Sequence, residues 1–266
     1  MSSVRTAWHV VFAALLKERA PPDVEVRAEV PLGSEPQRAD LLLLRRAGGP
    51  RGSGSVLAGL WPLFDLDALV EFKSTTRGFR RGDLVRLLGY GAQWHVAQLE
   101  RLEARGSLTL VLVLAGLGAA LEADLERLGW TLVPLADGYA RVEGGPYPVY
   151  VVDIDAVAAA EHDDLLGAFG HHTIHTIQAN HWWQEHLVMP TNPTDMSKLE
   201  GFDDMLRKFV ASLPPEQIAE CLTPEQRLAG LTLKQRLVGL TEAEIAATVD
   251  ALPPELLVAL RRRATD

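Results

Sequence analysis

Residues 108–114 form a run of seven in which six side chains are aliphatic and one is threonine. A strand with one face in water alternates apolar and polar side chains, whereas a strand covered on both faces is apolar nearly throughout. The run therefore predicts a central strand that helices cover on both sides. It indicates an α/β (α+β) fold in which helices flank a central sheet.

The other segments divide into helix-type and strand-type patterns. Residues 6–19 have apolar side chains at helical spacing, and Pro21-Pro22 ends that helix. Asp137-Gly138 stands between two apolar runs and is typical of a β-hairpin. The predicted helices are 6–19, 83–103 and 119–128, and the predicted strands are 24–32, 38–46, 68–74, 130–135, 139–142 and 147–154.

Composition limits the class of protein. The chain has 266 residues, of which 47% are hydrophobic and 23% charged, as in an ordinary globular protein. The net charge of −9 argues against a protein that coats nucleic acid nonspecifically, although it allows a local basic patch. Because there is neither a leader-like start nor an apolar run of about 18–20 residues, we expect a cytoplasmic protein without a membrane partner. Cys221 is the single cysteine, which excludes an intrachain disulfide.

The tripeptide Glu71-Phe72-Lys73 follows an apolar run. On a strand, alternate side chains share a face, so Glu71 and Lys73 point the same way. A carboxylate and an ammonium in this relation can share a metal-and-water site. A second acid, Asp40, opens the apolar strand 38–46. Taken alone, the tripeptide is also compatible with a solvated strand edge that carries a surface ion pair.

An Asp that opens one strand and a Glu-x-Lys that closes the next resemble the PD-(D/E)XK nuclease superfamily. The resemblance covers about residues 5–135 and implies a restriction-endonuclease-like core with a mixed central sheet. Within the superfamily, the chain is most similar to the recombination-promoting nuclease/putative transposase group. That likeness rests on the phrases Arg-Ala-Asp-Leu-Leu-Leu-Leu, Val-Glu-Phe-Lys-Ser and Gly-Asp-Leu-Val-Arg-Leu-Leu-Gly-Tyr, and on the tail from Leu222.

The resemblance implies a metal-dependent DNA endonuclease that hydrolyses phosphodiester bonds. Asp40, Glu71 and the backbone carbonyl of Phe72 would hold Mg²⁺, for which Mn²⁺ could substitute. Lys73 would lie beside the attacking water. There it could orient the water, act as a base if its pKa is lowered, or stabilise the phosphorane.

Three further residues are candidates by the same resemblance. Glu18 would be an auxiliary acid on the first helix, and its other interpretation is a solvated helix charge. Tyr90 and Gln93 share a face of the helix that follows the Glu-x-Lys motif, and they would face the site. Their alternatives are core packing for Tyr90 and solvent exposure for Gln93.

Arg77, Arg80 and Arg81 follow the motif and form a candidate phosphate-binding patch, or simply a solvated loop. The motif also departs from its usual form. Ala39 stands where the superfamily's name has Pro, and 30 residues separate Asp40 from Glu71. Asp65 and Asp67 are therefore rival acids. We prefer Asp40 because it precedes a well-defined buried strand.

The C-terminal half adds two features. A cluster of histidines suggests either a zinc site, since two of them are four residues apart, or a polar helix surface. From residue 213, Leu-Thr-led phrases recur every nine residues and predict short amphipathic helices that need a surface to pack on. We expect a nuclease-like domain at 1–155, a His-rich helical connection at 156–212 and a helical tail at 213–266. The clustered histidines are His171, His172, His175, His181 and His186.

Cleavage of both DNA strands needs two sites, so the resemblance also implies a homodimer. The alternative function is a catalytically silent nuclease-fold protein that binds nucleic acid or another protein. A protein-interaction role centred on the tail, and an unrelated α/β fold with a chance Glu-x-Lys, also remain open.

Overall fold

The computed structural model describes residues 6–32, 38–45, 54–102, 108–188 and 199–213, together with residue 218. Residues 1–213 form one compact unit, and residues 214–266 are assigned to a second. The predicted helical tail therefore lies outside the described residues, apart from residue 218. None of the helices in the described ranges is both long and apolar enough to cross a membrane.

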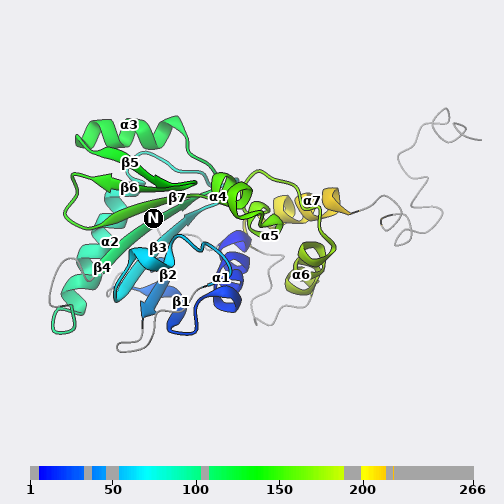
Figure 1. Cartoon of the computed structure of the whole chain (residues 1–266), viewed down its shortest axis with the longest axis horizontal. Helices are drawn as coiled ribbons and strands as arrows, with labels where there is room; N and C mark the ends of the chain where they lie inside the picture. The colour runs from blue at the N-terminus through cyan, green and yellow to red at the C-terminus, as the bar shows by residue number, and fades with distance from the viewer. Residues whose placement is uncertain are drawn as a thin grey trace, which may run out of the picture. The chain divides into compact units, whose positions relative to one another are not determined.

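A seven-stranded mixed sheet forms the centre of the first unit (Figure 1). Its strand order is β1-β2-β3-β4-β7-β6-β5. The central strands β3, β4 and β7 are parallel, and the two outer pairs on either side run antiparallel to their neighbours. The prediction of an α/β fold with a mixed central sheet flanked by helices is confirmed. The strands are β1 (Val24–Pro31), β2 (Arg38–Arg45), β3 (Asp67–Lys73), β4 (Leu108–Leu114), β5 (Thr131–Ala136), β6 (Tyr139–Glu143) and β7 (Val149–Asp153).

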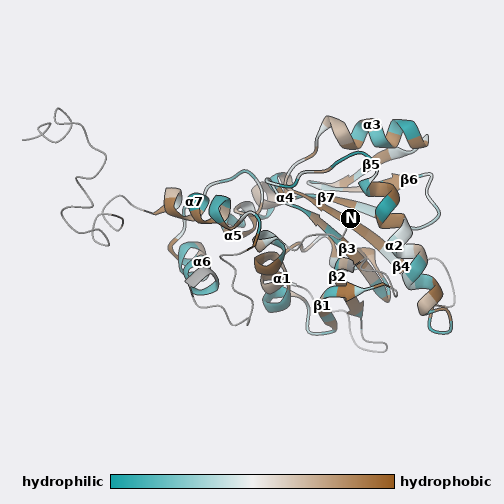
Figure 2. Ribbon diagram, turned by 180° about the vertical axis from the view of Figure 1, so that it is seen from behind, coloured by the Kyte–Doolittle hydropathy of each residue, from teal (hydrophilic) through white to brown (hydrophobic). Residues whose placement is uncertain are grey.

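Helices cover both faces of the sheet, and each face has its own apolar core. The helices α2 and α3 pack on one face, while α1 and the helices after β7 pack on the other. Figure 2 shows apolar residues along the inner strands and hydrophilic residues on α3. All seven residues of β4 are buried, as its composition predicts. The helices are α1 (Ala7–Arg19), α2 (Asp83–Ala97), α3 (Ala119–Leu128), α4 (Ile154–Glu161), α5 (Asp164–Gly167), α6 (Ile177–Val188) and α7 (Phe202–Ser212), with a 3-10 turn at Trp61–Leu63.

Residues beyond 155 pack into the same core as the N-terminal helix. The ring of Trp183 on α6 lies edge-on to that of Trp8 on α1, with 5.8 Å between ring centroids. Phe169 makes a similar contact with Phe12 at 5.4 Å. The backbone N–H of Ala7 donates to the carbonyl of Glu200 at 3.0 Å. The described residues between 156 and 212 thus share this core, and among the described residues the expected boundary at 155 does not separate two packed units.

Two local expectations differ from the structure. The helix after the Glu-x-Lys motif ends at Ala97, because Gln98 leaves helical geometry and donates its N–H to the carbonyls of His95 and Trp94. Residues 171–175 are not helical, since α6 begins at Ile177. The spacing of His171 and His175 therefore does not place them on one helix face.

Candidate functional site

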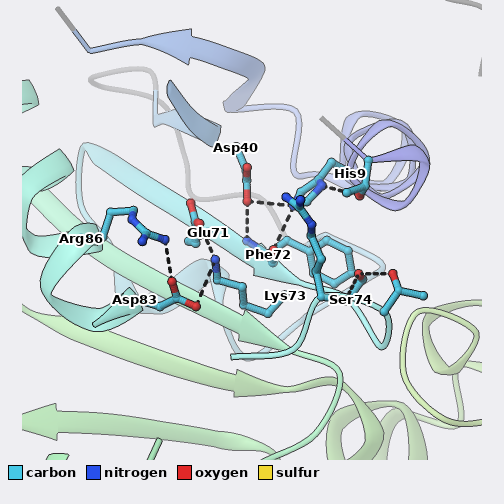
Figure 3. A network of polar contacts seen from close by, with 11 residues as sticks. His9, Asp40, Glu71, Phe72, Lys73, Ser74, Asp83 and Arg86 are labelled. Carbon is cyan, nitrogen blue, oxygen red and sulfur yellow. Dashed lines mark hydrogen bonds and ion pairs between the residues drawn. The ribbon is translucent and has the colours of Figure 1, made fainter. Parts of the chain in front are cut away.

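The strands β2 and β3 separate where Asp40 stands. Their antiparallel pairing runs from Leu44 opposite Asp67 to Leu41 opposite Val70. The next residue of β2, Asp40, accepts a hydrogen bond at its carboxylate from the backbone N–H of Phe72 at 2.9 Å (Figure 3). The side chain thus replaces a ladder contact and fixes the acid beside the Glu-x-Lys segment.

Glu71 and Lys73 lie at the carboxyl end of β3, with Lys73 Nζ donating to Glu71 Oε1 at 2.8 Å. Glu71 is 6% exposed and Asp40 is 7% exposed, so two acids share a largely dry site. Burial raises the pKa of Glu71 to about 7, the charge of Asp40 adds to the rise, and Lys73 opposes it. Burial and the charge of Asp40 therefore favour the protonated form of Glu71, although Lys73 lies beside it.

Asp83 is a second anchor for Lys73. Its Oδ2 lies 3.4 Å from Lys73 Nζ and accepts the backbone N–H of Arg80 at 2.9 Å. Its Oδ1 accepts a hydrogen bond from Arg86 at 2.6 Å. Burial alone would lower the pKa of Lys73, but the charges of Glu71 and Asp83 outweigh it and raise that pKa. Lys73 is thus held as an ammonium ion between two carboxylates.

His9, on the first turn of α1, is the residue that sequence reasoning missed. Its Nε2 lies 3.2 Å from Asp40 Oδ2 and 3.0 Å from the carbonyl oxygen of Phe72. Its Nδ1 lies 2.6 Å from the hydroxyl of Thr6. Burial would lower the pKa of His9, but the charge of Asp40 and its hydrogen bond raise it overall. The sequence signal for His9 is its place beside the apolar face of the first helix. The superfamily resemblance instead directed attention to an acid on that helix, Glu18.

Glu18 lies on the same helix but not beside Asp40. It accepts hydrogen bonds from the indole N–H of Trp182 and lies 2.8 Å from His186 Nε2. Nine residues span about two and a half helical turns, which puts Glu18 on the opposite face from His9. The structure thus places this predicted auxiliary acid against α6, and His9 takes the position beside Asp40.

Of the two predicted residues on α2, Tyr90 is buried and Gln93 is exposed. Burial and the charge of Glu71 raise the pKa of Tyr90 to about 12, so its hydroxyl is within the electrostatic reach of the acids. Tyr90 also belongs to the apolar core on the α2 side of the sheet. Both interpretations of Tyr90, as site wall and as core residue, are therefore consistent with the structure.

The predicted basic patch is divided. Arg77 forms an ion pair with Glu200, with Nη2 and Oε2 2.8 Å apart. Arg80 and Arg81 are exposed. Arg86, which was not among the predicted phosphate-binding residues, has a side chain 55% exposed and fixed by Asp83. It is the guanidinium that lies next to Lys73 and its partners in Figure 3.

The rival acids have other positions. Asp67 is 0% exposed, starts β3, and therefore lies at the opposite end of the strand from Glu71. Its carboxylate accepts hydrogen bonds from Trp94 Nε1 at 2.8 Å and from both terminal nitrogens of Arg101. Asp65 is exposed in the turn before β3. The structure thus brings Asp40, and neither rival, to Glu71 and Lys73.

The histidine cluster is dispersed over several partners. His171 Nδ1 lies 2.6 Å from Asp155, and the backbone N–H of His175 donates to Asp164. His186 contacts Glu18, and His181 lies 3.5 Å from Glu185. Within the described ranges, no three His, Cys, Asp or Glu side chains converge as a complete metal cage. The Asp40 carboxylate itself contacts the Phe72 N–H and the His9 imidazole.

Comparisons with protein-family models, with curated proteins and with solved structures find no match.

Proposed function

We propose that this protein is a metal-dependent DNA endonuclease with a restriction-endonuclease-like core, related to the recombination-promoting nuclease/putative transposase group. One observation carries the proposal. Asp40, far from Glu71 and Lys73 in sequence, is fixed next to them by its 2.9 Å bond to the Phe72 N–H. The order α1-β1-β2-β3-α2-β4, with β3 parallel to β4, supports the same fold assignment.

The residues present suit a divalent cation. Mg²⁺ prefers oxygen ligands, and Asp40 brings a carboxylate to the segment that carries the Glu71 carboxylate and the Phe72 carbonyl, through its hydrogen bond from the Phe72 N–H. The raised pKa of Glu71 is typical of a carboxylate whose charge needs a cation partner. We assign Asp40, Glu71 and the Phe72 carbonyl as the groups that would hold Mg²⁺ or Mn²⁺. When bound, the ion would neutralise phosphate charge and lower the pKa of its water.

Lys73 and Arg86 supply the other charges. Because Lys73 is held as an ammonium between Glu71 and Asp83, we assign it to orienting the attacking water and to stabilising the negative phosphorane. Arg86 presents an exposed guanidinium on the same carboxylate, Asp83, and its remaining N–H groups suit phosphate oxygens. These roles need no deprotonated lysine.

The test is cleavage of supercoiled plasmid with Mg²⁺ or Mn²⁺ by the full chain and by Asp40→Asn and Lys73→Met. We expect metal-dependent nicking or linearisation that falls by about 100-fold or more in both variants. Glu122→Gln, an exposed carboxylate on α3, is the matched control and should cut like wild type. Cutting that survives both site substitutions would refute the assignment. If the enzyme acts as the homodimer proposed for double-strand cleavage, linearisation should rise more steeply with protein concentration than nicking.

A catalytically silent nuclease-fold protein that binds nucleic acid is the second candidate. Two observations favour it. The Glu71 carboxylate is already occupied by its contact with Lys73. In the described part of the chain, no three metal-binding side chains converge. Folded wild type that binds DNA but cuts neither plasmid nor short duplexes with either ion would support this candidate.

A further inference from the structure

The outer face of α2 is apolar although it is exposed. Val85 and Val96 are 44% and 75% exposed, and Leu99, in the turn that follows the helix, is 63% exposed. Gly89 and Ala92 are exposed between the two valines. The successive spacings of four, three and four residues place 85, 89, 92 and 96 on one side of the helix, which is the pattern of a helix that packs against another helix. Within the described residues, nothing buries this face.

Gly89 has no role inside the described subunit that explains a glycine at this position. The nearby Gly91 is required by close packing, because a Cβ there would lie 2.8 Å from the side chain of Leu110 on β4. At Gly89, an added Cβ would meet no described atom within 4 Å, and its φ is not positive. A glycine in the middle of a helix lowers helix stability relative to alanine. What the missing side chain provides here is room for a second backbone to approach α2 from outside.

We propose that the outer face of α2, defined by Val85, Gly89, Ala92 and Val96, is the contact surface of a homodimer, in which it packs antiparallel on the same face of a second copy. A two-fold axis between Gly89 and Ala92 places each of these two residues opposite the other across the interface, and it places Val85 opposite Val96. Small residues then meet at the centre, where the helices come closest, and valines meet on both sides. The inference extends the homodimer of the proposed function, but it rests on α2 alone.

The charges at the two ends of α2 favour a second copy in this orientation. Arg80 and Arg81 are exposed just before the helix, and Glu100 is exposed just after it. The same two-fold axis brings Arg81 of one copy near Glu100 of the partner subunit, whereas a parallel pair would bring like charges together. Charges at the rim of an interface set orientation more than affinity. Because a single pair of helices is a small interface, we expect association in the micromolar range.

The principal experiment is sedimentation equilibrium of the full chain in EDTA without DNA, at protein concentrations from below to above the micromolar range. We expect wild type to pass from monomer to dimer. Val96→Glu places a charge in the apolar contact and should weaken association by about tenfold or more. Leu135→Glu changes an exposed leucine on β5 and is the matched control, which should associate as wild type does. A wild type that stays monomeric, or a dimer that Val96→Glu leaves intact, would overturn the inference.

A second variant separates loss of contact from loss of fold. Gly89→Gln replaces an exposed mid-helix glycine by a good helix former, so the thermal stability of the dilute monomer should rise. The longer side chain fills the space that the second backbone needs, so association should weaken by about tenfold or more. Association that Gly89→Gln leaves unchanged would show that the two helices do not meet at this residue.

Disulfide formation tests the antiparallel register in a Cys221→Ser background. Two copies of residue 85 would be about 16 Å apart along the helix axis, whereas a disulfide needs Cα atoms within about 7 Å. Neither Val85→Cys nor Val96→Cys alone should therefore form a disulfide-linked dimer on oxidation, but a mixture of the two variants should. Linked dimers in each variant alone, and none specific to the mixture, would contradict the antiparallel arrangement.

The outcome is separable from that of the proposed function, because association is measured without metal or DNA. If wild type is monomeric while metal-dependent cleavage is lost in Asp40→Asn, the α2 interface is wrong and the endonuclease site stands. If wild type forms the α2 dimer and no variant or wild type cuts, the interface stands and the endonuclease proposal fails.

Discussion

The Asp40 carboxylate accepts the backbone N–H of Phe72 at 2.9 Å, so a side chain takes the place of a main-chain carbonyl where β2 and β3 part. The same carboxylate lies 3.2 Å from His9. Asp40 therefore has two roles, one in satisfying a buried N–H group and one in the proposed site. Substitutions at this position must separate the two.

Asp40→Ala and Asp40→Asn should differ in stability. Alanine leaves the buried Phe72 N–H without its acceptor, which we expect to cost about 1–3 kcal/mol. Asparagine retains an oxygen acceptor without the charge, so its free energy of unfolding should lie closer to wild type. Urea unfolding in EDTA measures both. Equal loss in the two variants would show that the charge of Asp40, and not its hydrogen bond to Phe72, stabilises the fold.

The raised pKa of Glu71 predicts a pH dependence of stability in the metal-free protein. Between about pH 4.5 and 7 the native state keeps a proton that the unfolded state has lost, so the free energy of unfolding falls as pH rises through this window. Glu71→Gln has no carboxyl group to titrate, so its free energy of unfolding should not fall in this way. Relative to wild type, the stability of Glu71→Gln should therefore rise by about 1–3 kcal/mol between pH 5 and pH 8.

Urea unfolding at four pH values in EDTA tests that slope. Glu126 is an exposed acid on α3, and Glu126→Gln is the control. Its free energy of unfolding should change with pH as that of wild type does. A difference between Glu71→Gln and wild type that does not change with pH would contradict the raised pKa.

The ion pair between the buried Asp67 and the partly exposed Arg101 should be structural. Arg101→Met removes the guanidinium and leaves the Asp67 carboxylate buried against the indole N–H of Trp94, and we expect a loss of about 1–3 kcal/mol in stability. Metal-dependent cleavage per folded molecule should not change, in contrast to Asp40→Asn. The exposed neighbour Glu100→Gln is the control for stability. Loss of cleavage by folded Arg101→Met would restore Asp67 as a candidate site acid.

Two glycines with positive φ provide a matched pair. Gly129 ends α3 at φ 68°, where an added Cβ would meet open space, whereas at Gly138, φ 78°, a Cβ would be 2.6 Å from the backbone N of Val157. Gly129→Ala should cost about 1–2 kcal/mol for the left-handed backbone alone. Gly138→Ala adds a clash with main chain and should cost about 2–4 kcal/mol. Thermal unfolding compares them, and equal shifts would mean that the hairpin moves freely away from α4.

Much of the site was predictable because its signals are local. Asp40 opens an apolar strand, and Glu71 and Lys73 share a face of another, and the resemblance to the PD-(D/E)XK superfamily singled these three out. His9 and Asp83 were not predictable in their roles. Whether a helix presents His9 or Glu18 to a strand end depends on where the helix lies along the sheet, and periodicity within the helix does not contain that information. The contact of Asp83 with Lys73 depends in the same way on how the loop 74–82 folds back.

The packing of α6 on α1 was missed for a related reason. The sequence predicted a His-rich helical connection at 156–212, and it did not show that Trp183 lies against Trp8. Sequence separation hides this partnership, since neither helix alone indicates which surface it covers.

The bond between Ala7 and Glu200 has a practical consequence for how this protein can be divided. The strand ends that carry Asp40 and Glu71 depend on α1 for His9, and α1 is in turn held by segments near the end of the described chain. A fragment cut at residue 155 would expose Trp8 and Phe12. It would also leave α1 without the contacts that hold His9 beside Asp40. The shortest piece that preserves the site should therefore extend through Ser212, and a series of C-terminal truncations should lose the contacts of His9 and the packing of Trp8 at the same cut.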